Sequence, residues 1–333
     1  MTSRERVKCA IAFSGPDRVP ILHGVLPGAV DRHGERLRAL FERYPSDFAG
    51  QSGRYRSTEE SPHHQQGLDR DEWGCTWVNV IGGVEGQVRV HPLADWGALK
   101  DYRPPDPCAG HWGDPEARPE PDRYWLMGGG GGRLFERMHF LRGYQALLCD
   151  IAEGRPEVVA LRDVVLDHTL RRLEQQLVYQ ADGISFMDDW GCQDRLMICP
   201  EVWRDLFKPA YKRIADVVHA AGKQFYFHTD GYTLEILPDL IEIGADVINP
   251  QFSCMDLEGV AEVCAGRVCI SSDIDRQHLL PRGTPKEVRA HVRKVVELFG
   301  GARGGLIGRA EIGPDVPIEN AEAAFAAFAE YSA

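Results

Sequence analysis

Polar side chains follow several short apolar segments in the second half of the chain. His228 and Asp230 are two residues apart, and residues i and i+2 of an extended segment project from the same side. A histidine and a carboxylate arranged in this way can hold one cation or form an acid/base pair. A single histidine here would more often be a hydrogen-bonded core residue, so it is the spacing to Asp230 that favours a functional site.

Four other apolar segments end in similar groups, and each group has a simpler structural alternative. One aspartate of an adjacent pair can cap a turn, and only one is expected to face a ligand because successive strand residues alternate sides. An arginine and a glutamate can form a surface salt bridge that contributes little stability. Amides can orient a polar ligand or stabilise a turn. The groups are Asp188-Asp189-Trp190, Asn249-Pro250-Gln251, Ser271-Ser272-Asp273 and Arg309-Ala310-Glu311.

These segments alternate with amphipathic stretches of helical period, a pattern typical of a parallel sheet with connecting helices. We expect strands at residues 183–187, 224–228, 246–249, 268–271 and 305–308, and helices at 200–221, 233–243, 257–264, 284–299 and 318–331. The helix start at Thr284 is the clearest, because Thr284, Pro285 and Glu287 match an N-cap, a first-turn proline and a capping box. In a closed parallel barrel all strand ends point to one rim, where active sites are built from the following loops.

The first 120 residues are less regular. We expect a helix at residues 4–13, a strand at 19–23 that ends in His23, a strand at 85–90 in a hairpin or small antiparallel sheet, and loops at 51–70 and 104–121. A length of 333 residues fits one barrel of roughly 250 residues plus an extension. The predicted fold class is therefore α/β, a (β/α)₈ TIM barrel in a single domain over residues 1–333, in which residues 1–120 supply the N-terminal helix, the hairpin and loops over the site.

A run of glycines at positions 128–132 precedes Arg133, Arg137 and His139. It lacks the Lys-Ser/Thr of a phosphate-binding P-loop, so a flexible entrance loop is the better interpretation. The two arginines and the histidine that follow could bind an anion.

Composition excludes several classes of function. Thirty-eight Lys and Arg against 50 Asp and Glu leave a net charge of −12, which disfavours binding to nucleic acid or to an anionic membrane surface. The nine cysteines are scattered, without a C-x-x-C pair, and predict reduced thiols in a cytoplasmic protein. No apolar run approaches the roughly 20 residues that span a bilayer, so no membrane segment is expected.

Several motifs together resemble the uroporphyrinogen decarboxylase superfamily, and the resemblance runs from about residue 3 to residue 330. It implies a (β/α)₈ barrel with its site at the carboxyl ends of the strands. The motifs are Arg4-Glu5-Arg6-Val7, Pro16-Asp17-Arg18-Val19-Pro20, Asp71-Glu72-Trp73-Gly74, Phe135-Glu136-Arg137, Leu141-Arg142-Gly143, His228-Thr229-Asp230-Gly231, Asp246-Val247-Ile248-Asn249-Pro250-Gln251 and Pro314-Asp315-Val316-Pro317-Ile318-Glu319-Asn320.

This superfamily includes porphyrinogen decarboxylases and methyltransferases that act with corrinoid proteins. The decarboxylases have an arginine-rich N-terminal motif that holds the porphyrin carboxylates, but the equivalent stretch here, residues 21–28, contains no arginine. The acidic net charge also disfavours a polycarboxylate substrate. The resemblance therefore favours the corrinoid-dependent methyltransferase and O-demethylase branch, with the corrinoid (cobalamin) on a partner protein, and it suggests a homodimer.

Methyltransferases of this branch hold zinc with a His-x-Cys pair and a cysteine after the last strand. Here the matching positions are His228, Asp230 and Glu311. Zinc also accepts carboxylate oxygens, and a catalytic zinc usually has three protein ligands and one open position. The resemblance thus implies a zinc site at these three residues.

The predicted function is methyl transfer from a small methylated compound, most simply an O-methyl compound, to a corrinoid protein. The catalytic set is Asp189, His228, Asp230 and Glu311, in which a metal acts as Lewis acid or, without metal, His228 or Asp189 protonates the leaving oxygen. Two alternatives stay open: a decarboxylase or other lyase of a small carboxylated substrate, and a non-catalytic binding or regulatory barrel. The residues expected to bind substrate are His23, Trp190, Asn249, Gln251, Asp273 and Arg309, with Tyr226 and Phe252 beside Trp190 in an apolar pocket.

Overall fold

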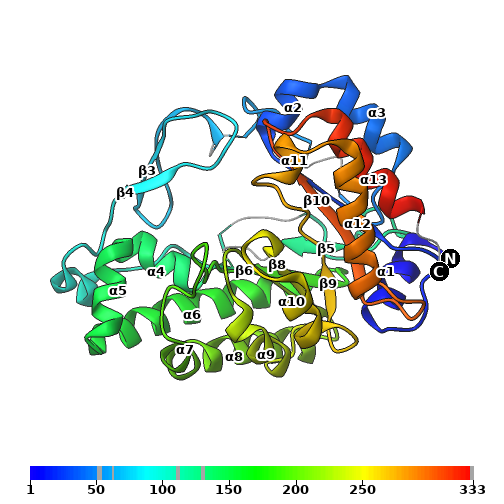
Figure 1. The fold of residues 1–333 in the computed structure, drawn as a ribbon. Coiled ribbons are helices and arrows are strands. Elements are labelled where there is room, and N and C mark those ends of the chain that lie inside the picture. Colours follow the sequence, from blue (N-terminus) through cyan, green and yellow to red (C-terminus); the bar gives the residue numbers. More distant parts are fainter. Residues whose placement is uncertain (51–54, 62–63, 110–112, 129–131, 331–333) are drawn as a thin grey trace.

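A curled sheet of parallel strands forms the centre of the molecule (Figure 1). The computed structural model describes residues 1–50, 55–61, 64–109, 113–128 and 132–330. Neighbouring strands follow the order β1-β10-β9-β8-β7-β6-β5. Their bounds are β1 Ile21–Val25, β5 Leu126–Gly128, β6 Gly183–Met187, β7 Gln224–Thr229, β8 Val247–Pro250, β9 Cys269–Ser271 and β10 Leu306–Ile312.

A short segment around Asp47 lies between the two edges of this sheet. The Asp47 amide donates to the carbonyl of Ile21 on β1 at 2.8 Å, and the Tyr124 amide donates to the carbonyl of Asp47 at 3.0 Å. The Ala49 amide in turn donates to the carbonyl of Tyr124, just before β5, at 2.8 Å. The segment therefore takes the eighth position, and the fold is the predicted α/β barrel of the TIM type.

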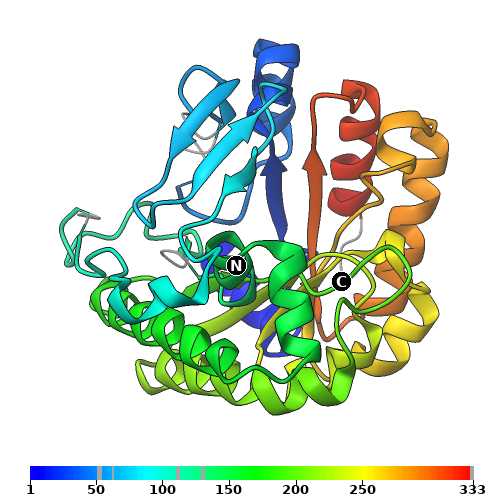
Figure 2. The ribbon, with the colours of Figure 1, turned by 90° about the vertical axis from the view of Figure 1, so that its left-hand side faces the viewer.

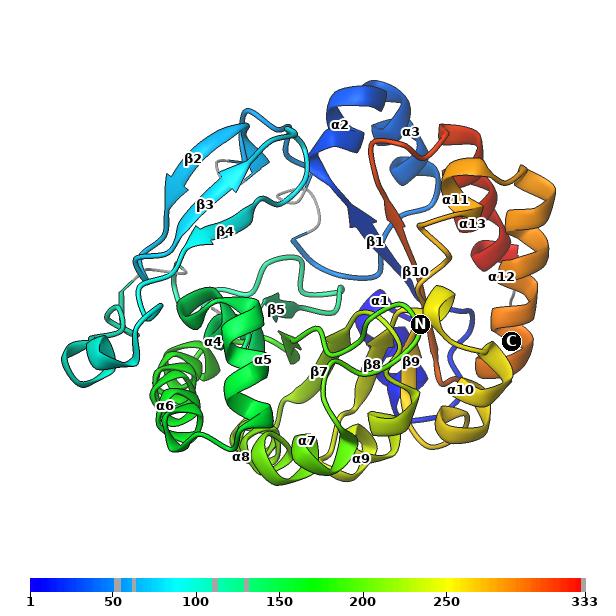
Figure 3. The same cartoon turned by 60° about the vertical axis from the view of Figure 1, so that its left-hand side comes forward.

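Helices cover the outer face of the sheet (Figure 3). In the described part of the chain, no helix is long and apolar enough to cross a membrane. Their bounds are α1 Ser3–Ile11, α2 Pro27–His33, α3 Glu35–Arg43, α4 Phe135–Arg142, α5 Tyr144–Ala152, α6 Pro156–Leu177, α7 Pro200–Leu206, α8 Lys208–Ala220, α9 Leu237–Glu242, α10 Leu257–Cys264, α11 Leu279–Arg282, α12 Pro285–Phe299 and α13 Ile318–Glu330.

Local chemistry accounts for the helix boundaries. The capping box predicted at Thr284 is confirmed, since its hydroxyl accepts from the Glu287 amide at 3.3 Å and the Glu287 carboxylate accepts from the Thr284 amide at 2.7 Å. The single helix predicted at 200–221 is wrong, because the structure has α7 and α8 with a break at Phe207. Pro209 explains the break, since a proline cannot donate the backbone hydrogen bond that a continuous helix needs.

The strand β10 extends beyond its predicted range of 305–308 to Ile312, and its residues 308–312 pair with β1. Arg309 and Glu311 therefore lie within the strand and not after it. Both side chains lie at the rim of the barrel. They project from the same face of β10 because they are two residues apart.

A second sheet stands apart from the barrel, above α4 and α5 (Figures 1 and 2). It is antiparallel, in the order β2 (Gly67–Arg70), β3 (Thr76–Asn79) and β4 (Gln87–Val90). The antiparallel strand predicted at 85–90 is confirmed as β4, whereas β2 occupies the end of the stretch predicted as a loop at 51–70. All four residues of β2 are exposed, so this strand lacks the buried alternate side chains by which sequence patterns reveal strands.

The barrel interior below the rim is filled by apolar and aromatic side chains. One cluster of buried residues joins the strands to α1: Val7, Ile11, Leu22, Phe48, Tyr124, Leu126, Tyr226, Val247, Cys269 and Ile307. A larger cluster packs the outer face of the sheet against the helices. All nine cysteines are free. Apolar packing thus fills the barrel beneath the ends of the strands.

Candidate active site

Three predicted residues meet at the ends of β6 and β7. His228 lies in β7, Asp230 follows that strand, and Asp189 comes two residues after β6. The Nε2 atom of His228 is 3.4 Å from Asp230 Oδ1 and 3.8 Å from Asp189 Oδ1. One ligand atom from each of the three residues lies within 4.8 Å of the others, which is the spacing of a possible metal site.

The orientation of the His228 ring is set by Asn249 on the neighbouring strand β8. Asn249 Nδ2 donates to the carbonyl of Ser271 at 2.7 Å, so its Oδ1 is free to accept. His228 Nδ1 lies 2.8 Å from that oxygen and therefore carries a proton. Nε2 is left to face the two carboxylates.

The charges around the ring favour its protonated form. Burial lowers the pKa of His228, but the hydrogen bond and charge of Asp230, together with the charge of Asp189, outweigh it and raise that pKa to about 9. Burial opposes ionisation of Asp230, yet His228 and Arg276 hold the pKa of its carboxyl well below the usual range. Without a metal, the ring is thus a cation between two carboxylates at neutral pH.

Arg276 extends this cluster across the mouth of the barrel. Its guanidinium donates to Asp230 and, through Nη1, to Glu311 Oε1 at 2.8 Å. Arg309 donates to the other oxygen of Glu311 at 2.6 Å. Arg276 was not among the predicted residues, because it lies in the loop after β9 and no periodic pattern marks it.

Asp273 lies beneath the two arginines and is 1% exposed. Its carboxylate oxygens are 3.8 Å from Arg276 and 3.7 Å from Arg309, and within the described ranges neither oxygen has a hydrogen-bond partner. Burial raises the pKa of Asp273 to about 6. This carboxyl group is therefore the least satisfied acid of the cluster.

The donor set fits a divalent cation held by Asp189, His228 and Asp230. Imidazole nitrogen and carboxylate oxygens are common zinc ligands, and a metal-ligating histidine usually donates its other ring N–H to an oxygen, as His228 does to Asn249. Glu311 is separated from this set by Arg276, which binds it. The prediction that Glu311 is a ligand would require Arg276 to release it.

The family model described as uroporphyrinogen decarboxylase (URO-D) matches residues 133–331, which is more than half of the chain. The chain belongs to the URO-D family. The superfamily predicted from the motifs is thereby confirmed, and the matched region carries every residue of the cluster just described.

A solved methyltransferase structure shares the fold of this URO-D family member. A methyltransferase from Methanosarcina mazei superposes with a TM-score of 0.67 over 99% of each chain at 17% sequence identity. A B12-independent methionine synthase from Shewanella sp. W3-18-1 reaches a TM-score of 0.47 at 13% identity, covering 91% of this chain and 87% of its own. No curated protein sequence matches the chain.

The adjacent acids Asp188 and Asp189 have different surroundings, as the alternation of strand residues predicts. Asp188 is fully buried and accepts the backbone N–H groups of residues 134, 135 and 136 at 2.7–2.8 Å. It also accepts the Tyr211 hydroxyl at 2.7 Å. Asp188 thus caps the N-terminus of α4, and Asp189 faces His228.

The structure does not bring His23 to the rim cluster. Its ring stacks on Phe41 of α3 with centroids 4.0 Å apart, and its Nε2 lies 2.7 Å from the carbonyl of Tyr44. Burial lowers the pKa of His23 to about 4, so it is a neutral residue of the helix-facing layer. The preceding Leu22 points into the barrel instead, and the alternation of β1 places His23 on the outer face.

The aromatic residues expected in an apolar pocket are all buried elsewhere. Trp190 is completely enclosed, stacked on Phe135 at 4.1 Å between centroids, and donates its indole N–H to Tyr211. Tyr226 is in the barrel interior, and Phe252 stacks on Phe299.

Gln251, also expected to bind substrate, accepts a hydrogen bond from the Gly231 amide at 2.8 Å and so stabilises the turn after β7.

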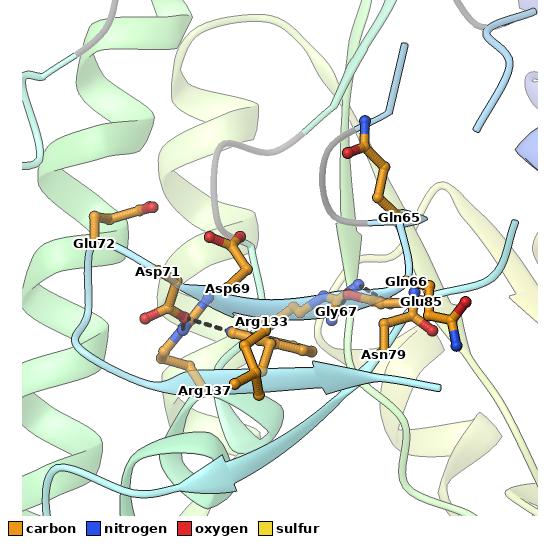
Figure 4. A pocket seen from close by; sticks show the side chains of 13 residues that line it. Gln65, Gln66, Gly67, Asp69, Asp71, Glu72, Asn79, Glu85, Arg133 and Arg137 are labelled. Carbon is orange, nitrogen blue, oxygen red and sulfur yellow. Dashed lines mark hydrogen bonds and ion pairs between the residues drawn. The ribbon is translucent and has the colours of Figure 1, made fainter. Parts of the chain in front are cut away.

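Two cavities lie between the small antiparallel sheet and α4. One, of about 390 Å³, is lined by β2, β3 and the two arginines 133 and 137 (Figure 4). Both arginines predicted to bind an anion already face carboxylates: Arg137 donates to Asp71 at 2.7 Å, and Arg133 contacts Glu85 at 3.3 Å. The second cavity, of about 960 Å³, lies along β4, α4 and α5 and is also lined by Arg133.

Proposed function

We propose that this protein transfers a methyl group from a small O-methyl compound to the cobalt of a corrinoid carried by a separate protein. The observation that carries the proposal is the position of His228 Nε2 between Asp189 and Asp230 at the mouth of the barrel. Breaking a C–O bond leaves an electron pair on oxygen, and a site for methyl transfer must stabilise that oxygen. Family membership and the shared fold of the Methanosarcina mazei methyltransferase support this chemistry.

The residues of the cluster can each be given a part. Asn249 orients the His228 ring, and Arg276 holds Asp230 in place against the repulsion of Asp189. Arg309 binds Glu311, and we assign it to polar groups of the substrate. Asp273 is enclosed beneath Arg276 and Arg309, so its part is to hold the two guanidinium groups in place. A divalent ion such as zinc, held by Asp189, His228 and Asp230, would supply Lewis-acid stabilisation of the leaving oxygen.

The direct test uses purified protein, cob(I)alamin and a panel of methoxybenzenes, with the cobalt absorption spectrum followed over time. We expect alkylation of the cobalt in the presence of protein and its loss in Asp230→Ala, with metal content measured on the same samples. An absence of alkylation with every divalent metal would contradict the proposal. Release of CO₂ from a carboxylated substrate without any corrinoid would instead support the decarboxylase alternative.

The same proposal includes a corrinoid-protein partner, a cytoplasmic location and a homodimer. Sedimentation of the purified chain measures the oligomeric state. Pull-down with the corrinoid protein of the same genome, carrying cobalamin, tests the partner.

A further inference from the structure

One oxygen of Asp230 faces both His228 and Arg276. This atom, Oδ1, lies 3.4 Å from His228 Nε2 and also accepts a hydrogen bond from Arg276 Nη2. The same nitrogen of His228 faces Asp189 Oδ1 at 3.8 Å. A divalent ion bound to His228 Nε2 and Asp230 Oδ1 would therefore share a carboxylate oxygen with a guanidinium group. Two cations on one oxygen repel each other, so the position of Arg276 opposes metal binding at Asp230.

The two carboxylates that hold Arg276 each have a second positive partner. Arg276 binds Asp230 and donates through Nη1 to Glu311 Oε1 at 2.8 Å. Glu311 also accepts from Arg309 at 2.6 Å, through its other oxygen. Asp230 would keep a bound metal. Neither carboxylate would therefore lack a positive neighbour if Arg276 moved away from a metal-loaded site.

The neighbouring Asp273 has unused acceptor atoms. It is 1% exposed, and in the described residues neither of its carboxylate oxygens has a hydrogen-bond partner. Oδ2 is 3.8 Å from Arg276 Nε, which is about 1 Å beyond an ordinary N–H···O distance. An enclosed carboxylate without donors is costly, so hydrogen bonds from Arg276 would stabilise Asp273. A small rotation of the Arg276 side chain is enough to form them.

We propose that Arg276 exchanges partners when a divalent ion such as zinc binds: it binds Asp230 and Glu311 in metal-free protein and donates to Asp273 in metal-loaded protein. In the metal-free state the guanidinium supplies the positive charge between the carboxylates. Its transfer leaves Asp230 Oδ1 to the ion and releases Glu311 Oε1, as the predicted role of Glu311 as a ligand requires. Asp273 is thus a positioning residue that acts through Arg276. This inference rests on the metal site of the proposed function and deepens it.

The other arginine at the rim, Arg309, is fixed by the sheet. It lies within β10, opposite Leu22 of β1, and its backbone N–H donates to the Ser272 hydroxyl at 2.8 Å. Arg276 belongs instead to the loop between β9 and α11. Of the two, Arg276 is the side chain that can change partners, while Arg309 stays with Glu311.

The first experiment is a double-mutant cycle on zinc affinity, measured by competition with a chromophoric chelator. The variants are Arg276→Met, Asp273→Asn and the combination of both. Arg195→Met and Asp194→Asn, which break an exposed pair, are the matched controls and should bind zinc as the wild type does. We expect Arg276→Met to bind zinc about 10-fold more tightly and Asp273→Asn about 10-fold more weakly.

The combined variant distinguishes the exchange from a simple effect of charge. If Asp273 acts by receiving Arg276, its replacement should change zinc affinity by less than about 2-fold once Arg276 is absent. If the 10-fold loss persists in the Arg276→Met background, Asp273 acts on the ion through its own charge, and the exchange is contradicted.

The second experiment needs no variant and so does not depend on how well the variants fold. Crystal structures of the wild type are determined with chelator and with zinc. We expect Arg276 on Asp230 and Glu311 in the first structure and on Asp273 in the second. A guanidinium that stays on Asp230 in the zinc-loaded protein, or a wild type that binds no zinc, would overturn the inference.

Both experiments omit the methyl donor and the corrinoid. A zinc-dependent exchange of Arg276 in a protein without methyl transfer would therefore contradict the proposed function and support the exchange. Methyl transfer by a protein in which Arg276 stays on Asp230 would contradict the exchange alone.

Discussion

His228 and Asn249 face each other across the ends of β7 and β8, and the Nδ1–H of the histidine donates to the amide oxygen of the asparagine at 2.8 Å. The asparagine itself donates to the carbonyl of Ser271 at the end of β9. Three consecutive strands thus determine which ring nitrogen of His228 faces the two carboxylates. The reactive face of the cluster is set by sheet pairing and does not depend on a flexible loop.

Replacement of Asn249, which orients the His228 ring, should weaken metal binding. In Asn249→Leu the His228 ring loses its fixed tautomer and orientation, and partners of this kind usually contribute 10- to 100-fold to metal affinity. We expect a loss of about that size for zinc, measured by competition with a chromophoric chelator. Gln175→Leu, on the exposed side of α6, is the matched control and should bind as the wild type does. Equal affinity in Asn249→Leu would contradict the assignment of His228 as a ligand.

Stability should fall with rising pH in metal-free protein. The pKa of His228 is raised from an ordinary 6.5 to about 9 in the folded state. Its protonated form therefore stabilises the fold fully below pH 6.5, and this contribution, at most about 3 kcal/mol, is lost as the pH rises through 9. Urea unfolding with chelator at several pH values measures the effect. The slope should flatten in His228→Gln and persist in His278→Gln, an exposed histidine; an unchanged slope in both would show that another group titrates.

Arg276 should be required for stability as well as for the site. Its loss in Arg276→Met removes a charged partner from two mostly buried carboxylates, Asp230, which keeps His228, and Glu311, which keeps Arg309. Breaking a buried pair from one side costs about 3 kcal/mol or more, whereas an exposed pair contributes about 1 kcal/mol at most. Arg195→Gln, which breaks the exposed pair with Asp194, is therefore the control. Similar unfolding free energies of the two variants would show that water replaces Arg276.

Asp188 and Asp189 should differ in what their replacement changes. Asp188→Ala removes the acceptor of three backbone N–H groups and of Tyr211, so we expect a loss of about 3 kcal/mol in unfolding free energy. Asp189→Asn keeps its size and should alter stability by less than about 1 kcal/mol, while it lowers methyl transfer. Thermal unfolding and the cobalt assay on both variants test this division. A large stability loss in Asp189→Asn would place that residue in the framework of the fold.

Some parts of the candidate site were visible in the sequence because they depend on local patterns. The spacing of His228 and Asp230 identified a pair on one side of β7, and the position of Asp189 after β6 placed it at the same rim. Arg276 was not predicted, since it reaches the cluster from the loop after β9. Its position three residues after Asp273 was the only signal in the sequence, and an arginine at such a spacing is too common to be informative.

The sequence by itself determined the alternating strands and helices of the second half of the chain and the fact that polar groups end those strands, because alternation and capping are properties of a few neighbouring residues. Only the tertiary structure decided which of these groups meet. It turned His23 and Trp190 away into buried aromatic layers, gave Asp188 to the N-terminus of α4, and placed Arg276 between Asp230 and Glu311. Those outcomes depend on which side of each strand faces the barrel axis and on distances between residues far apart in the chain, and neither is encoded in a local pattern.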